Sequence, residues 1–291
     1  MIHTNSEFHL VECPRDAMQG WKSFIPTQKK IEYINALLQV GFDMIDFGSF
    51  VSAKAIPQMA DTKEVVSQLS NVNGKTKLLA IVANTRGAQE AMAFDKITHL
   101  GFPFSISQTF QLRNTNSSIE ESLNRVEEIK ALCVKNKKEL VVYISMGFGN
   151  PYGDVYNEGI VMDWIDKLVR MEIKIISMAD TVGLAEPSQI SSILNKLIPQ
   201  YPKIEIGVHL HSTPLTWKEK IDAAVHAGCK RFDGALKGIG GCPMANDNLV
   251  GNINTELMIA YFEELSFLPK LNKDALLKAL LFADEIFKTN I

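Results

Sequence analysis

The sequence is poor in the features that mark disulfide-bonded, membrane or nucleic-acid-binding proteins. Its 291 residues include only four cysteines, and none is spaced as CxxC or as a disulfide framework, which favours a reducing, cytoplasmic setting. Thirty Lys and Arg against thirty-three Asp and Glu give a formal net charge of −3, so no basic surplus attracts nucleic acid or an anionic membrane surface. No apolar run approaches the roughly 20 residues of a membrane-spanning helix. We therefore expect neither nucleic acid nor a membrane as a partner.

Signals for targeting and for a divided chain are also missing. The first seven residues, MIHTNSE, have neither the basic stretch nor the apolar stretch of a secretory signal. No linker, low-complexity tract or long charge run interrupts the sequence. Hydrophobic residues make up 46% of the chain, which is ordinary for a globular protein. We expect residues 1–291 to fold as one domain.

Short apolar runs alternate with amphipathic stretches along the whole sequence. Each of eight runs is typical of a buried strand, and a helical stretch follows each of them. Eight evenly spaced strand–helix units, with no GxGxxG segment, predict an α/β protein with a (β/α)8 TIM barrel; a doubly wound sheet is the alternative. A further amphipathic stretch predicts an additional C-terminal helix at about 272–288. The predicted strands are Phe8–Glu12, Met44–Phe47, Lys77–Ala83, Ile97–Ser105 (interrupted by Pro103), Glu139–Met146, Ile173–Asp180, Ile204–Val208 and Arg231–Leu236.

Two histidines stand at the end of the seventh predicted strand. His209 and His211 are separated by one residue, so on a strand their side chains would point to the same side. Two imidazoles at a strand end are a natural pair of ligands for a divalent metal. A pair of hydrogen-bonded core histidines is the alternative. The two residues alone do not decide between these interpretations.

Oxygen-bearing side chains at neighbouring strand ends favour the metal. In a barrel the chemistry lies at the carboxyl ends of the strands, and closure makes the eighth strand a neighbour of both the seventh and the first. Asp16, after the first strand, and Asn252, after the eighth, would then converge on the two histidines. A carboxylate, two imidazoles and an amide oxygen suit Mg²⁺ or Mn²⁺ better than Zn²⁺. The alternatives are that Asp16 caps a helix or loop and that Asn252 is an N-cap.

The segment at about 238–252 is predicted to be an active-site loop. It is rich in glycine, shows no apolar periodicity and carries Cys242. A thiol on such a loop, next to a cationic site, can donate or accept a proton. The other three cysteines lie in predicted elements and are interpreted as packing residues.

Several short segments together resemble the 3-hydroxy-3-methylglutaryl-CoA lyase family, a group of metal-dependent DRE-TIM lyases. The similarity runs from about Glu12 to Glu264. The segment around Cys242 is the specific one, because the related Claisen-type synthases carry an acidic Gly-Glu-Arg-type segment in place of Gly-Cys-Pro. The matching segments are Pro14–Asp16, Ser49–Ser52 with Pro57–Met59, Asp180–Gly183, Val208–His211 and Gly238–Pro243.

The resemblance implies a barrel enzyme that cleaves 3-hydroxy-3-methylglutaryl-CoA, an acyl-CoA thioester, to acetyl-CoA and acetoacetate, the chemistry of leucine degradation. It also implies a homodimer and a divalent metal cation, Mg²⁺ or Mn²⁺, as cofactor. Under this resemblance we expect metal ligands at Asp16, His209, His211 and Asn252, substrate contacts at Arg15, Gln19 and Ser49, and catalytic residues at Cys242, Arg15, Asp180, Asp46 and His209.

The chain departs from the family pattern around these ligands. Asp46 stands where the family usually has Glu, Ser212 stands where it has Asp, and Met244 follows Gly-Cys-Pro in place of Tyr. Because the expected ligands are kept and their surroundings are changed, the rival enzyme is a lyase for a different 3-hydroxyacyl-CoA or an aldolase of a 2-oxo acid. The rival from another class is a catalytically silent barrel that binds metal and ligand.

Overall fold

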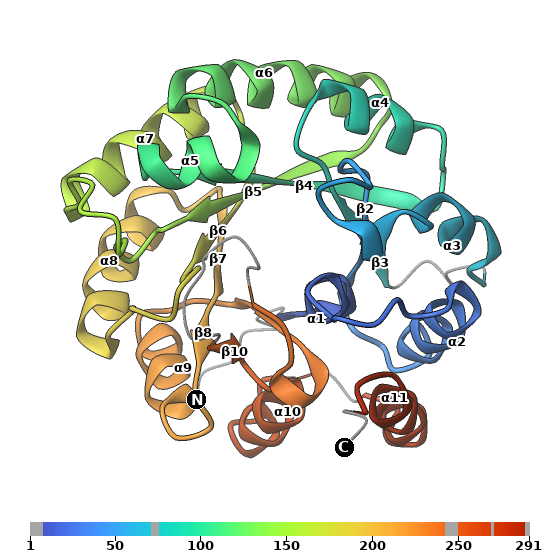
Figure 1. Ribbon diagram of the computed structural model, residues 1–291. Helices are drawn as coiled ribbons and strands as arrows, with labels where there is room; N and C mark the ends of the chain where they lie inside the picture. The colour runs from blue at the N-terminus through green and yellow to red at the C-terminus, as the bar shows by residue number, and fades with distance from the viewer. Residues whose placement is uncertain (1–7, 71–75, 242–249, 269–270, 289–291) are drawn as a thin grey trace.

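The computed structural model describes residues 8–70, 76–241, 250–268 and 271–288. Within these residues, eight parallel strands close into a barrel in the order β1-β2-β3-β4-β5-β6-β7-β9. Figure 1 looks along the barrel and shows the helices arranged around the strands. The prediction of a (β/α)8 barrel is confirmed. The barrel strands are β1 (His9–Glu12), β2 (Met44–Ser49), β3 (Lys77–Ile81), β4 (Ile97–Ser105), β5 (Glu139–Ser145), β6 (Ile175–Ala179), β7 (Glu205–His209) and β9 (Arg231–Gly234).

Helices cover the outside of the barrel, and a few short elements accompany them. Two strands of two residues, β8 (His211–Ser212) and β10 (Gly251–Asn252), form a separate antiparallel pair. Two short 3-10 helices are η1 (Pro57–Met59) and η2 (Leu236–Gly238). Across the described part of the chain, no helix has the length and apolarity needed to cross a membrane. The α-helices are α1 (Pro14–Gln19), α2 (Thr27–Leu37), α3 (Thr62–Gln68), α4 (Thr85–Met92), α5 (Gln108–Thr115), α6 (Ile119–Lys135), α7 (Glu158–Arg170), α8 (Pro187–Gln200), α9 (Trp217–His226), α10 (Thr255–Glu264) and α11 (Lys273–Ile286).

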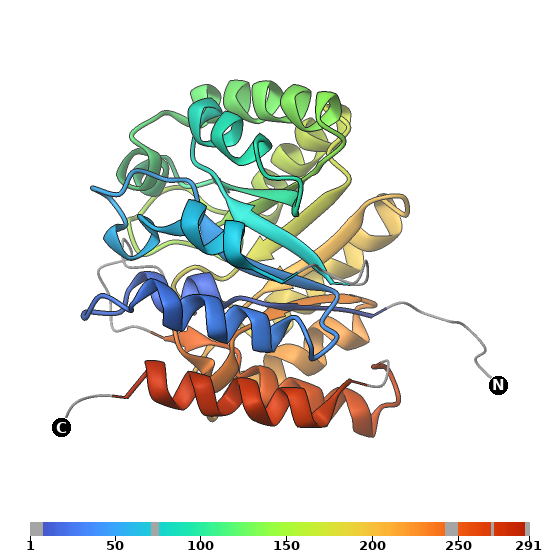
Figure 2. The same ribbon diagram turned by 90° about the vertical axis from the view of Figure 1, so that its right-hand side faces the viewer.

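The predicted additional C-terminal helix is present as α11. Asn272 caps its first turn by accepting a hydrogen bond from the backbone N–H of Ala275 at 3.1 Å. Its buried residues Leu276, Ala279 and Ala283 recur at the spacing of one helical face. α11 packs against α2, and Figures 1 and 2 both show the two helices side by side. The chain therefore closes its outer ring of helices with an element beyond the eight repeated units.

Pro103 does not interrupt β4, contrary to the sequence prediction. The strand runs through Pro103, which stands opposite Tyr143 of β5. On its other side β4 pairs with β3 only as far as Gly101. A residue without an N–H at position 103 therefore removes no ladder hydrogen bond on the β3 side. The helices α1 and α5 are also additions to the prediction. α1 has only six residues, and the two buried residues of α5, Phe110 and Gln111, are adjacent and form no apolar stripe.

The inside of the barrel holds a buried arginine as well as apolar side chains. Arg231 is 1% exposed, and its guanidinium donates a hydrogen bond to Glu205 Oε1 at 3.0 Å. The absence of a side chain at Gly207 leaves room for the arginine, because a Cβ there would lie 2.6 Å from Arg231 Cδ. Arg231 Nε also lies 3.7 Å from Asp233 Oδ1, nearer the carboxyl end of the barrel. The charged side chains of Glu205, Arg231 and Asp233 therefore follow one another inside the barrel toward its carboxyl end.

Glu12 fastens the first barrel strand to the segment that follows β9. Its carboxylate accepts hydrogen bonds from the backbone N–H of Leu236 at 2.8 Å and from the hydroxyl of Thr255 at 2.6 Å. Burial raises the pKa of Glu12 to about 8, although these hydrogen bonds act in the opposite direction. The folded protein therefore holds a carboxyl group that favours its protonated form at neutral pH.

We expect the pH dependence of stability to reveal this carboxyl group. Because the pKa of Glu12 is higher in the folded protein than its ordinary value of 4.5, its stabilising contribution is complete below that value and is lost as the pH rises toward about 8. Glu12→Gln cannot ionise, so its melting temperature should fall less than that of the wild type over this range. Glu120→Gln, on the exposed face of α6, is the control. Parallel melting curves against pH for Glu12→Gln and the wild type would contradict the assignment.

Candidate active site

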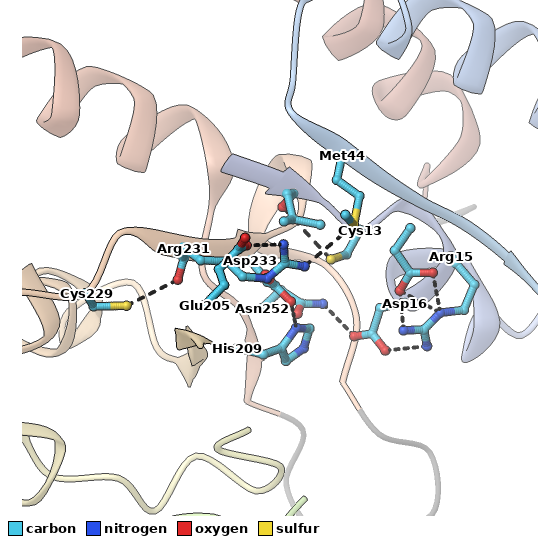
Figure 3. A network of polar contacts seen from close by, with 12 residues as sticks. Cys13, Arg15, Asp16, Met44, Glu205, His209, Cys229, Arg231, Asp233 and Asn252 are labelled. Carbon is cyan, nitrogen blue, oxygen red and sulfur yellow. Dashed lines mark hydrogen bonds and ion pairs between the residues drawn. The ribbon is translucent and has the colours of Figure 1, made fainter. Parts of the chain in front are cut away.

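The side chains predicted as metal ligands meet at the carboxyl end of the barrel. Asp16 lies on α1 directly after β1, His209 ends β7 and His211 opens β8. Potential ligand atoms of these three residues all lie within 4.8 Å of one another. Asn252, on β10, donates from Nδ2 to Asp16 Oδ2 at 2.7 Å, as Figure 3 shows. Barrel closure thus brings together residues that are more than two hundred positions apart along the chain.

The two histidines do not share one strand, contrary to the sequence prediction. β7 ends at His209, and His211 begins a short strand that pairs antiparallel with β10, where it stands opposite Asn252. The two rings still come together, with centroids 5.3 Å apart and planes at 62°. The break in the strand after His209, and not strand alternation, therefore sets the relation between the rings.

A glycine allows the chain to lie directly against this cluster. Gly240 has a φ of +109°, and a Cβ there would lie 2.5 Å from Asn252 Nδ2 and 2.9 Å from the backbone oxygen of Asp16. The neighbouring Ile239 accepts a second hydrogen bond from Asn252 Nδ2, at 2.9 Å, through its backbone oxygen. The first residues of the glycine-rich segment are therefore packed onto the Asp16–Asn252 pair.

Some buried polar atoms of the cluster make no well-formed hydrogen bond within the described residues. They are the side-chain oxygen of Asn252 and both ring nitrogens of His211. Because Asp16 and Ile239 use the amide nitrogen of Asn252, its oxygen keeps its lone pairs available. Buried acceptors are rarely left unpaired, and a carboxylate, two imidazoles and an amide oxygen fit a divalent cation. The N-cap interpretation of Asn252 is wrong, since Asn254 caps α10.

The charges around Asp16 and His211 favour the protonation states in which these two side chains bind cations. Burial alone would raise the pKa of Asp16, but the Arg15 guanidinium and then the two imidazoles lower it to about 2. Burial and the charge of His209 lower the pKa of His211 to about 4, opposed by Asp16 and by a backbone contact with Thr181. An ionised carboxylate and a neutral imidazole are the forms in which these side chains act as ligands.

Asp233 belongs to the cluster and was missed by the sequence analysis. Its Oδ2 lies 3.3 Å from His209 Nδ1 (Figure 3), and its side chain is fully buried. Burial lowers the pKa of His209, but the hydrogen bond and charge of Asp233, together with the charge of Asp16, raise it above its ordinary value. A carboxylate behind an imidazole holds the ring in one orientation and leaves Nε2 for a cation. The available signal was the two-residue period of β9, which puts Arg231 and Asp233 on one side and Phe232 on the other.

Cys13 lies next to the His209–Asp233 pair. Potential ligand atoms of these three residues also lie within 4.8 Å of one another. The thiol of Cys13 is fully buried, and burial raises its pKa well above the ordinary value. A protonated, buried thiol acts as a small apolar side chain, which agrees with the interpretation of Cys13 as packing. Cys133 and Cys229 are likewise buried.

Arg15 is held beside the cluster by two carboxylates. Its Nη2 and Nε lie 2.5 Å and 3.0 Å from Asp46 Oδ2, and its Nη1 lies 2.8 Å from Asp16 Oδ1. Asp46 therefore anchors the guanidinium at two points although its side chain is one methylene shorter than the Glu usual in the family. The Arg15 side chain is only 10% exposed. A fixed cation thus stands next to the candidate metal ligands, where it can oppose negative charge that develops on a substrate.

A cavity of about 550 Å³ opens over the cluster, within the size range of small-molecule sites. Gln19 in its wall donates a hydrogen bond to Asp16 Oδ1 at 2.8 Å and so helps to orient that carboxylate. The cavity therefore gathers all the predicted substrate contacts and three of the predicted metal ligands. The predicted residues in its lining are Arg15, Asp16, Gln19, Ser49, His209 and His211.

The remaining predicted residues lie beside the cavity or outside the described part of the chain. Asp46 is buried behind Arg15, and Asn252 is buried beside Asp16. Asp180 is buried and faces Lys220, whose Nζ lies 2.8 Å from Asp180 Oδ2. Cys242 falls among the residues that the structure does not describe. The catalytic roles expected of Asp46, Asp180 and Cys242 and the metal-ligand role expected of Asn252 stay predictions.

The fold and the cluster together define a class of protein. A (β/α)8 barrel with a carboxylate, two imidazoles and an amide oxygen at the carboxyl ends of its strands, beside a fixed arginine, is a metal-dependent barrel enzyme. The family model described as HMGL-like matches residues 10–282 of this chain. The chain belongs to the HMGL-like family.

Individual relatives agree with this assignment. The chain is 34% identical over 246 residues to the cytoplasmic 3-hydroxy-3-methylglutaryl-CoA lyase of Rattus norvegicus, covering 84% of this chain and 71% of that protein. It is 32% identical over 273 residues to the hydroxymethylglutaryl-CoA lyase YngG of Bacillus subtilis, covering 94% and 90% of the two. Among solved structures, an HMG-CoA lyase from Acinetobacter baumannii in complex with coenzyme A and 3-methylmalate has a TM-score of 0.90 at 30% identity, covering 98% of this chain and 93% of that one.

Proposed function

We propose that the protein is a divalent-metal-dependent lyase that cleaves 3-hydroxy-3-methylglutaryl-CoA to acetyl-CoA and acetoacetate. The observation that carries the proposal is the meeting of a carboxylate and two imidazoles beside Arg15 in one cavity. Relatives named for this activity align with most of the chain. Mg²⁺ or Mn²⁺ is the proposed cation, because oxygen donors from Asp16 and Asn252 accompany the imidazoles.

Two arginines in the same cavity suit the phosphates of a CoA thioester. Arg113 and Arg125 lie in the cavity lining together with the metal cluster. The Arg113 guanidinium lies 4.5 Å from the centre of the Tyr152 ring, which holds it against the cavity wall. Arg125 donates to the backbone oxygen of Thr115 at 3.4 Å and forms no ion pair within the described residues. Guanidinium groups placed in this way can bind phosphate oxygens. An acyl-CoA substrate is therefore the proposed partner.

The cation and the side chains around it would share the work of the reaction. A bound divalent cation would polarise the substrate's oxygen atoms and lower the pKa of its 3-hydroxyl group. A general base in the site would accept the hydroxyl proton as the bond between carbons 2 and 3 breaks. Carbon 3 then becomes the ketone carbon of acetoacetate, which departs, and the electron pair of the broken bond remains on carbon 2 as a thioester enolate. Arg15 opposes the charge on the enolate oxygen, and Asp46 keeps the guanidinium in place.

Two further residue roles and the oligomeric state rest on the sequence and on the resemblance. Cys242 is proposed to deliver the proton that converts the enolate into acetyl-CoA, since in the sequence it directly follows Gly240 and Gly241. Asp180 is proposed to orient the metal ligands and not to touch the substrate. A homodimer is proposed on the resemblance alone.

A cleavage assay with and without EDTA tests the proposed function. We expect 3-hydroxy-3-methylglutaryl-CoA to be split into acetyl-CoA and acetoacetate, EDTA to abolish this turnover, and Mg²⁺ or Mn²⁺ to restore it. Other 3-hydroxyacyl-CoA thioesters and 2-oxo acids should react far more slowly. Preferential cleavage of one of these compounds would replace the proposed substrate. A protein that binds the cation but turns over none of them would be the silent barrel.

A further inference from the structure

A buried lysine on α9 grips the backbone of a candidate metal ligand. Lys220 is 5% exposed, and its Nζ donates to Asp180 Oδ2 at 2.8 Å, to the backbone oxygen of His211 at 2.8 Å and to the backbone oxygen of Gly183 at 3.1 Å. A lysine ammonium has three donors, and all three have a partner here. The three hydrogen bonds therefore fix the position of the ammonium group, and one of them joins it directly to the main chain of His211.

Asp180, the partner of Lys220, is hydrogen-bonded to the backbone of the other histidine, His209. Its backbone N–H donates to the backbone oxygen of His209 at 2.9 Å. Its Oδ1 accepts a hydrogen bond from the backbone N–H of Ala185 at 3.0 Å, which ties down the loop between β6 and α8. The Lys220–Asp180 pair thus contacts the main-chain oxygens of both imidazole ligands. Neither of the two charged side chains lies in the described lining of the cavity.

Stability alone is a poor reason for an ion pair in this position. Taking two charges out of water offsets most or all of their attraction, so a buried pair is weak evidence of net stabilisation. The ring nitrogens of His211 make no well-formed hydrogen bond within the described residues, so no side-chain partner holds that ring from behind. His209, by contrast, has Asp233. Apart from a backbone contact with Thr181, the ring of His211 is held through its own backbone, which pairs with Asn252 of β10 and contacts Lys220.

We propose that Lys220 is a positioning residue of the metal centre, which places the ring of His211 by holding the backbone oxygen of that residue. The inference rests on the proposed metal centre. Metal sites tolerate only small displacements of their ligands, on the order of 0.5 Å, before affinity falls. Groups that orient a ligand without touching the metal typically account for about 10–100-fold in metal affinity.

The test measures binding of Mn²⁺ alone to the metal-free protein, by isothermal titration or by the electron paramagnetic resonance signal of free Mn²⁺. Lys220→Met should weaken Mn²⁺ binding by at least about tenfold. Lys138→Met is the matched control: Lys138 is also buried and donates to the backbone oxygens of Phe94 and Ile97, next to the other end of the barrel strands. It should lose stability and keep the Mn²⁺ affinity of the wild type. Equal affinity in Lys220→Met and the wild type would overturn the inference.

A double variant separates placement from charge balance and from folding. Lys220→Met leaves Asp180 as an unpaired buried carboxylate, and Asp180→Asn added to it removes that charge while keeping an acceptor for Ala185. We expect the double variant to regain melting temperature and to keep the weak Mn²⁺ binding, because the contact with the His211 backbone is still missing. Recovery of wild-type affinity in the double variant would overturn the inference, since Lys220 would then only neutralise Asp180. A wild-type protein that binds no Mn²⁺ would overturn the metal centre and this inference with it.

Discussion

Replacing His211 with alanine is expected to weaken Mn²⁺ binding at least about tenfold and to lower kcat by orders of magnitude while the barrel stays folded. His211 supplies an imidazole to the cluster, and neither of its ring nitrogens makes a well-formed hydrogen bond within the described residues. Loss of the ring therefore removes a ligand without leaving a partner unsatisfied. Titration of Mn²⁺, steady-state kinetics and thermal melting together check this expectation.

The control for this variant is His226→Ala, at the exposed end of α9. It should match the wild type in all three measurements, because His226 lies on the surface away from the cluster. If His211→Ala kept the Mn²⁺ affinity and the EDTA sensitivity of the wild type, His211 would not be a ligand. A large fall in melting temperature with unchanged Mn²⁺ affinity would make it a structural core histidine, the alternative that the sequence leaves open.

The chain's periodic patterns carry much of the information about the fold and the ligands. Apolar runs of strand length, each followed by an amphipathic stretch, are local signals, and they suffice for the barrel. Closure is a general property of that fold, and it is enough to bring Asp16 and Asn252 to the histidines. These predictions depend on the order of the strands and, for the two histidines, on the alternation of side chains along a strand.

What could not be predicted depends on contacts between distant segments. The antiparallel pairing of β8 with β10 is a long-range pairing of two-residue strands, which no local pattern reveals. The partnership of Asp233 with His209 requires the register of neighbouring barrel strands, where His209 stands opposite Asp233. In the sequence, Lys220 resembles a solvent-exposed lysine on an amphipathic helix. In the structure, the loop after β6 covers it and supplies its partners Asp180 and Gly183. The tertiary structure decides which buried polar side chains become partners, so these networks are the features that are hardest to predict from the sequence.

Arg15→Gln is expected to lower kcat by at least about 10²–10³, the scale of losing one donor to a developing oxyanion, with a smaller change in KM. The guanidinium is fixed by Asp46 and Asp16 and is nearly buried, so it needs little reorganisation to meet charge that appears only during bond breaking. Glutamine keeps one donor and loses the positive charge. Steady-state kinetics with 3-hydroxy-3-methylglutaryl-CoA measures the effect.

Metal binding distinguishes Arg15 from the ligands around it. Because the guanidinium lies 2.8 Å from Asp16 Oδ1, it repels a cation held by that carboxylate, and its removal should leave Mn²⁺ affinity unchanged or raise it. Arg15→Gln should therefore share the loss of turnover expected of His211→Ala but, unlike that variant, keep its Mn²⁺ binding. Arg15→Lys keeps the charge but not the two-point contact with Asp46, so its kcat should fall between those of Arg15→Gln and the wild type. If Arg15→Gln changed KM alone, the arginine would bind substrate without a special role in the transition state, and charge stabilisation of the enolate would have to come from the metal centre.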